Sequence, residues 1–90
     1  MTKRLIVFTL NGCGTCNRLK EKIKMESIPF TEYEVGDNEE MWEQVVSQTK
    51  SEYVPTFLIK DEEKDEGMVF CPITDFNDEE DAMKIIKQYF

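Results

Sequence analysis

Two cysteines separated by two residues are the side chains of this sequence whose type and spacing indicate chemistry. Cys13 and Cys16 follow an unbroken apolar run and precede a charged segment in which Leu19 and Ile23 lie four positions apart. The apolar run predicts a buried strand, and the segment after it predicts an amphipathic helix. Unpaired N–H groups and a partial positive charge at the start of such a helix stabilise a thiolate. The sequence therefore predicts a redox-active pair where a strand passes into a helix.

The order of the two cysteines predicts their roles. Thiols of Cys-x-x-Cys motifs at helix starts have pKa values of roughly 3.5 to 7.5, below the ~8.5 of a free cysteine. We expect Cys13 to be the exposed thiolate that attacks, and Cys16, one turn later on the same face, to be the resolving thiol. Gly12 and Gly14 flank Cys13 and allow a partner chain to approach its sulfur. Arg18 is close enough in sequence to favour the thiolate, and it also fits a solvated helix face.

The motif alone leaves other interpretations open, namely a chance pair of small buried side chains or half of a zinc site. A tetrahedral zinc site needs four ligands. The chain offers one further cysteine, Cys71, and no histidine, so we expect no metal site of this kind. Because Cys71 lies next to Phe70 in an apolar segment, we expect it to be a buried structural thiol.

Size, charge and cysteine content restrict the class of protein. Ninety residues predict one domain over 1–90 with a single core. The net charge of −8 and the pI near 4.5 argue against nucleic acid or an anionic membrane as partner, because these require clustered Lys and Arg. We expect no signal peptide and no membrane span, since no segment is apolar enough. A close cysteine pair without an export signal indicates a reducing compartment, and we expect a cytoplasmic monomer.

The rest of the chain predicts an alternation of strands and helices. Hydrophobic periodicity favours strands over 4–10, 30–35, 56–59 and 68–71, and helices over 14–26, from the start signal at 36–40 to about 50, and over 77–90. Capping-box spacing in Asp37 with Glu40, and in Asn77 with Glu80, predicts where the second and third helices begin. The acidic run 60–67 predicts the loop of a β-hairpin. The expected order is β-α-β-α-β-β-α.

This order, with Cys-x-x-Cys after the first strand and Val54-Pro55 before the third, resembles the glutaredoxin branch of the thioredoxin fold over nearly the whole chain. The resemblance implies an α/β fold with a four-stranded mixed sheet in the order 2-1-3-4. It places the first and third helices on one face and the second on the other. It also implies a cis Val54–Pro55 peptide bond and a backbone pairing between Val54 and the substrate.

The same resemblance implies a thiol–disulfide oxidoreductase that serves electron transport and cell redox homeostasis. It would reduce protein or glutathione mixed disulfides through Cys13 and Cys16, with no bound cofactor and with glutathione as co-substrate. We expect the substrate to contact residues around the dithiol, the Val-Pro bond and the turn after the fourth strand. These residues are Gly12, Gly14, Thr15, Tyr53, Val54, Pro55, Thr74 and Asp75.

Departures from the family pattern bear on the substrate and on the alternatives. Glutaredoxins carry a Lys shortly before the first cysteine, where this chain reads 9–12 as Thr-Leu-Asn-Gly, and a Gly-Gly pair after the fourth strand, where Cys71-Pro72 stands. Three alternatives stay open. The protein could be a carrier or sensor of an iron–sulfur cluster bound through Cys13, a thioredoxin-like electron donor reduced by a flavin-dependent reductase, or an interaction module with a vestigial site.

Overall fold

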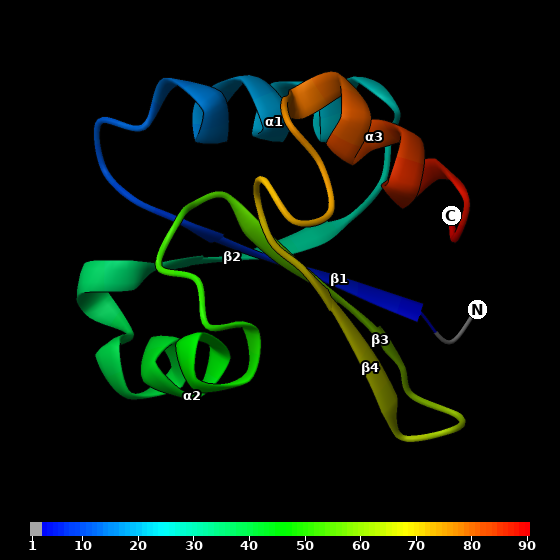
Figure 1. Ribbon diagram of the computed structural model, residues 1–90. Coiled ribbons are helices and arrows are strands. Elements are labelled where there is room, and N and C mark those ends of the chain that lie inside the picture. Colours follow the sequence, from blue (N-terminus) through cyan, green and yellow to red (C-terminus); the bar gives the residue numbers. More distant parts are fainter. Residues whose placement is uncertain (1–2) are drawn as a thin grey trace.

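The computed structural model describes residues 3–90, in which a four-stranded mixed sheet is covered by helices on both faces (Figure 1). The elements are β1 Lys3–Thr9, α1 Gly14–Met25, β2 Phe30–Glu34, a 3-10 turn Val35–Asp37, α2 Glu39–Thr49, β3 Thr56–Asp61, β4 Glu66–Phe70 and α3 Glu79–Lys87. The strand order β2-β1-β3-β4 and the element order confirm the predicted thioredoxin-like topology. No helix within residues 3–90 is both long and apolar enough to cross a membrane.

Strand β1 is central, and its alternating side chains divide the interior into two layers. It runs parallel to β2 and antiparallel to β3. Because successive side chains of a strand point to opposite faces, Leu5 and Val7 pack on the side of α1 and α3, whereas Phe8 packs on the side of α2. Figure 1 shows α1 and α3 together on one face of the sheet and α2 on the other, as the resemblance implied.

The larger core lies between the sheet and the pair α1 and α3. Helix α1 contributes Leu19 and Ile23 at the predicted spacing of four, and both are fully buried. Helix α3 contributes Ala82, Met83 and Ile86. Each fully buried Leu or Ile stabilises the fold by about 1.5–3 kcal/mol relative to an exposed one, so this layer fixes α1, and with it the cysteine pair, on the sheet.

The smaller core on the other face is built around Trp42. Its ring lies 5.6 Å from that of Phe8, and Phe8 lies 5.8 Å from the ring of Tyr33. Val45 completes the buried set. Met41, the neighbour of Trp42 in the chain, is 39% exposed and is not part of this core.

Two helix starts differ from the prediction. Helix α2 is preceded by Asn38, whose side chain does not cap it, while the carboxylate of Glu34 accepts the N–H of Asp37 in the turn before. Helix α3 is capped by Asp78, whose carboxylate accepts the N–H of Asp81 at 2.8 Å. The expected boxes are therefore wrong. In runs rich in Asp, Asn and Glu, several residues satisfy the capping spacing equally well.

The acidic run forms the tip of the β3–β4 hairpin, as predicted, but both strands extend further into it. The register pairs Asp61 with Glu66, so the unpaired loop is confined to 62–65. Strand β4 ends at Phe70, one residue earlier than expected. Each paired backbone group satisfies a hydrogen bond, which explains why charged residues continue the ladder.

A buried hydroxyl joins the end of β1 to β2. Thr9 is 2% exposed, and its hydroxyl donates to the carboxylate of Glu32 at 2.7 Å. Lys20 of α1 donates to the same oxygen at 2.8 Å. These two donors, the ammonium of Lys20 first and the hydroxyl of Thr9 second, hold the pKa of Glu32 below its ordinary value of 4.5. The charged form of Glu32 therefore stabilises the folded chain.

Glu32→Gln is expected to lower the free energy of unfolding by about 0.5–1 kcal/mol near neutral pH, a small value because Glu32 is 37% exposed. A carboxyl whose pKa is lowered by folding contributes its stability above the unfolded pKa and loses it as the pH falls through the folded pKa. The difference between wild type and variant should therefore shrink below about pH 4.5. Urea unfolding at several pH values measures it.

Glu43→Gln on α2 is the matched control for this prediction, because within the described residues Glu43 makes no ion pair or side-chain hydrogen bond. A pH-independent difference between wild type and Glu32→Gln would contradict the assignment.

Candidate functional site

A tight turn delivers the first cysteine from the end of β1 to the start of α1. The N–H of Cys13 donates to the carbonyl of Leu10 at 3.1 Å, which closes the turn. Gly12 has a φ of +84°, a conformation that side chains with a Cβ rarely adopt. The glycine before Cys13 thus lets the chain reverse within a few residues.

Cys13 caps α1 with its own sulfur. It is the residue before the first helical residue, Gly14, and its Sγ accepts the backbone N–H of Cys16 at 3.1 Å. Cys13 is partly exposed, whereas Cys16 is fully buried. The two form a disulfide with a Cα–Cα distance of 5.3 Å, inside the usual range for such bonds. The helix start thus presents an N–H group to the sulfur that solvent can reach.

The segment before β3 reaches the same edge of the sheet as the cysteines. The register pairs Phe8, near the end of β1, with Thr56, the first residue of β3. The Val54–Pro55 peptide bond just before it is cis, as the resemblance implied. The hydroxyl of Thr56 donates to the carbonyl of Tyr53 at 2.8 Å, and the ring of Tyr53 is 61% exposed.

The turn after β4 carries the last two candidate substrate residues. Cys71 and Asp75 close this turn with two bonds: the N–H of Asp75 donates to the carbonyl of Cys71, and the N–H of Cys71 donates to the Asp75 carboxylate at 2.9 Å. Thr74 is exposed. One carboxylate oxygen of Asp75 is therefore occupied within its own turn, which the sequence did not indicate. Phe57, the second residue of β3, pairs with Phe70 at the end of β4. This turn therefore lies at the same end of the sheet as the dithiol.

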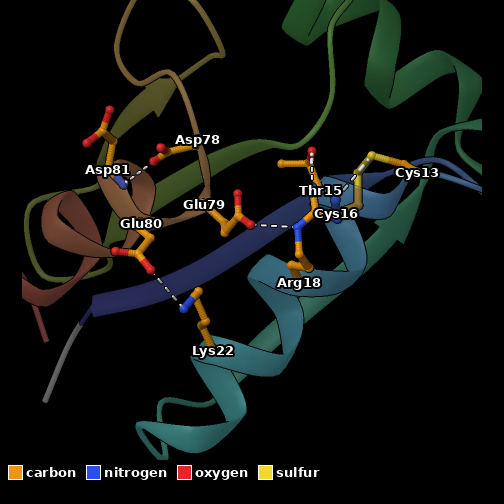
Figure 2. A network of polar contacts seen from close by, with 9 residues as sticks. All are labelled: Cys13, Thr15, Cys16, Arg18, Lys22, Asp78, Glu79, Glu80 and Asp81. Carbon is orange, nitrogen blue, oxygen red and sulfur yellow. Dashed lines mark hydrogen bonds and ion pairs between the residues drawn. A yellow bond between two sulfur atoms is a disulfide. The ribbon is translucent and has the colours of Figure 1, made fainter.

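A network joins the dithiol turn to the start of α3 (Figure 2). The Nε of Arg18 donates to Glu79 at 2.6 Å, and its Nη2 donates to the hydroxyl of Thr15 at 3.1 Å. The pKa of Glu79 is lowered by its own backbone N–H and, next, by the guanidinium of Arg18. Sequence analysis singled out Arg18 but missed Glu79, because no local pattern distinguishes this carboxylate from its neighbours.

The third cysteine is separate from this chemistry. Cys71 is 3% exposed and carries a free thiol, which agrees with the prediction of a buried thiol. Across residues 3–90 no group of three or more His, Cys, Asp or Glu side chains is placed to hold a metal ion.

A family model provides the comparison that decides the relationship. The model described as Glutaredoxin matches residues 5–63, more than half of the chain, including the cysteine pair and the cis bond. The chain belongs to the glutaredoxin family. No curated protein matches the sequence. Family membership and the close cysteine pair together support a thiol–disulfide oxidoreductase in the general sense.

The family match ends within the loop of the β3–β4 hairpin. Residues 64–90, with β4, the turn around Asp75 and all of α3, lie outside the match. Glu79 is among them, so the partner of Arg18 lies beyond the part of the chain that the family model matches.

Proposed function

We propose that this glutaredoxin reduces protein and glutathione mixed disulfides, with Cys13 as the attacking sulfur and Cys16 as the resolving one. One observation carries the proposal: the sulfur of Cys13 caps α1, accepts the N–H of Cys16 at 3.1 Å and is the more exposed of the pair. A hydrogen bond to an ionised acceptor is roughly twice as strong as one to a neutral acceptor. The helix start therefore favours the thiolate that attack requires.

The reaction balances with the dithiol alone. The thiolate of Cys13 attacks one sulfur of a substrate disulfide, the substrate S–S bond breaks, and its other sulfur leaves as a thiolate. The thiol of Cys16 then loses its proton and attacks the sulfur of Cys13, which releases the second substrate thiolate. Two electrons pass to the substrate, and the protein is left with the Cys13–Cys16 disulfide. The proton of Cys16 goes to the substrate thiolate released in the first step, because a thiolate is a much stronger base than water.

Apolar side chains around the dithiol support protein disulfides as substrates. Leu10 is 48% exposed, Tyr53 61% and Ile73 70%, and the three stand in the turn after β1, the segment before β3 and the turn after β4. The strand registers bring these three segments to the same end of the sheet, and large exposed apolar side chains favour contact with another protein. In the proposal an extended substrate segment pairs with the backbone of Val54 while Gly12, Gly14 and Thr15 lie beside the reacting sulfur.

The proposal extends to the electron source and the cellular setting. Glutathione is the co-substrate that reduces the Cys13–Cys16 disulfide, and Thr74 and Asp75 bind its ammonium end with the carboxylate oxygen of Asp75 that the turn leaves over. The protein carries no resident cofactor and works as a cytoplasmic monomer. Its net charge of −8 supports protein partners over nucleic acid or an anionic membrane.

A comparison of electron donors tests this function. Reduction of a glutathione mixed disulfide of a protein is expected to proceed faster with glutathione and glutathione reductase than with a thioredoxin reductase. The rate is measured as consumption of the nicotinamide cofactor by either reductase. Faster turnover with thioredoxin reductase would instead support a thioredoxin-like donor. A brown, sulfide-containing dimer that depends on Cys13 would favour a cluster carrier over the proposed enzyme.

A further inference from the structure

One guanidinium group touches both residues that separate the cysteines. The Nη2 of Arg18 donates to the Thr15 hydroxyl at 3.1 Å. A Cβ added to Gly14 would meet the Nη1 of Arg18 at 3.2 Å, so the guanidinium lies over the space that the glycine leaves free. The third nitrogen, Nε, donates to the carboxylate of Glu79 at 2.6 Å. Figure 2 shows Arg18 between Thr15 and Glu79, at the end of α1 that carries the disulfide.

The ion pair is not needed to hold the two helices together. Leu19 and Ile23 of α1 already pack with Met83 and Ile86 of α3 in the buried core. A second pair, Lys22 with Glu80 at 3.5 Å, joins the same helices one turn further along. Surface ion pairs of this kind contribute about 0–1 kcal/mol. What distinguishes the pair of Arg18 and Glu79 is its contact with the dithiol turn.

We propose that Glu79 is a positioning residue for the dithiol, because it fixes the guanidinium of Arg18 against Thr15 and neutralises its charge at the turn that carries Cys13. Through this contact the start of α3 sets how strongly the thiolate of Cys13 is stabilised. The inference rests on the proposed function in one respect, since it assigns the controlled thiolate to Cys13. It adds a residue from the part of the chain that the family model does not match.

The charges that face Arg18 determine the sign of the effect. Glu79 is ionised at neutral pH, since its pKa is lowered. The neighbouring Asp78 is occupied by the N–H of Asp81, and Glu80 is paired with Lys22. The net charge of the Arg18–Glu79 pair is zero, so removal of either member leaves the other as an uncompensated charge at the turn between the two cysteines. An uncompensated cation favours a thiolate, whereas an uncompensated carboxylate disfavours it.

Two neutral substitutions should therefore shift the pKa of the Cys13 thiol in opposite directions. In the reduced protein, Glu79→Gln should shift the pH midpoint of Cys13 alkylation downward, and Arg18→Gln should shift it upward. Each shift should correspond to about a two- to three-fold change in the thiolate fraction, the size expected for a unit charge acting through solvent. Arg18 is 59% exposed, which keeps the change small. The double variant should return to the wild-type midpoint.

The measurement is the rate of iodoacetamide alkylation at Cys13 across a pH series, read by mass spectrometry of the peptide that contains Cys13. Glu80→Gln is the matched control, because it removes the adjacent α1–α3 ion pair without touching the dithiol turn, and its midpoint should equal that of wild type. Equilibration with a glutathione redox buffer gives a second readout. Glu79→Gln should become more oxidising and Arg18→Gln more reducing, since a more stable thiolate stabilises the reduced form.

The alkylation midpoints of the variants test the role of Glu79, and the midpoint of the wild-type protein tests the proposed function. Shifts of both single variants in the same direction would indicate a merely structural ion pair and would overturn the inference, as would midpoints that do not move. If Cys13 of the wild-type protein is instead alkylated like a cysteine in an unstructured peptide, the proposed function itself fails.

Discussion

Replacing Cys13 with serine is expected to reduce disulfide turnover to the uncatalysed background, a loss on the order of 10³-fold or more. The chemistry requires a sulfur that forms and then gives up an S–S bond, and a serine oxygen cannot take part in that exchange. In this protein Cys13 is also the sulfur that accepts the N–H of Cys16 at the helix start. The loss should appear in reduction of a glutathione mixed disulfide under saturating glutathione.

The other two cysteines supply the controls for this prediction. Cys16→Ser should keep the first attack and accumulate a mixed disulfide between Cys13 and the substrate, detectable as an added mass. Cys71→Ser should keep turnover near wild type, because this thiol is 3% exposed and lies outside the Cys13–Cys16 disulfide. Activity that survives Cys13→Ser but is lost in Cys71→Ser would reverse the assignment of the nucleophile.

The elements that carry the dithiol could be predicted because their signals are local. The apolar run of β1 and the spacing of Leu19 and Ile23 required nothing beyond neighbouring residues, and both residues are fully buried in the structure. Sheet order and the cis Val54–Pro55 bond were different. The sheet order depends on pairing between distant segments, and a cis bond before proline is intrinsically rare. Both were expected only through the resemblance to a family.

The contacts around the site could not be predicted, because they join distant residues of interchangeable type. Arg18 and Glu79 are 61 positions apart, and the chain has 19 acidic residues among which no pattern selects Glu79. The prediction of the capping residue of α3 was wrong for a related reason. Asn77 and Asp78 are adjacent capping residues followed by three acids, and only packing of Ala82 and Ile86 on the sheet decides which one caps the helix.

Phe57→Ala is expected to cost about 3–5 kcal/mol of unfolding free energy, the range for truncating a fully buried aromatic side chain. Phe57 is 0% exposed, and its ring lies 5.1 Å from that of Phe70 and 5.4 Å from that of Phe76. A small domain is stable by roughly 5–15 kcal/mol in total, so much of the margin should disappear. Urea unfolding monitored by the single tryptophan, Trp42, measures the change from the opposite face of the sheet.

The Phe57→Ala substitution should also disturb the dithiol site, because Phe57 supports the segment before β3 and the turn after β4. It stands one residue after Thr56, whose hydroxyl fixes the segment before β3, and it stacks on Phe76, which ends the turn of Asp75. Phe57→Leu keeps most of the apolar volume and should cost about 1–1.5 kcal/mol. Phe90→Ala, at a position 37% exposed, should stay within about 0.5 kcal/mol of wild type. Equal costs for Phe57→Ala and Phe90→Ala would show that the stacked rings do not hold the sheet and the turn together.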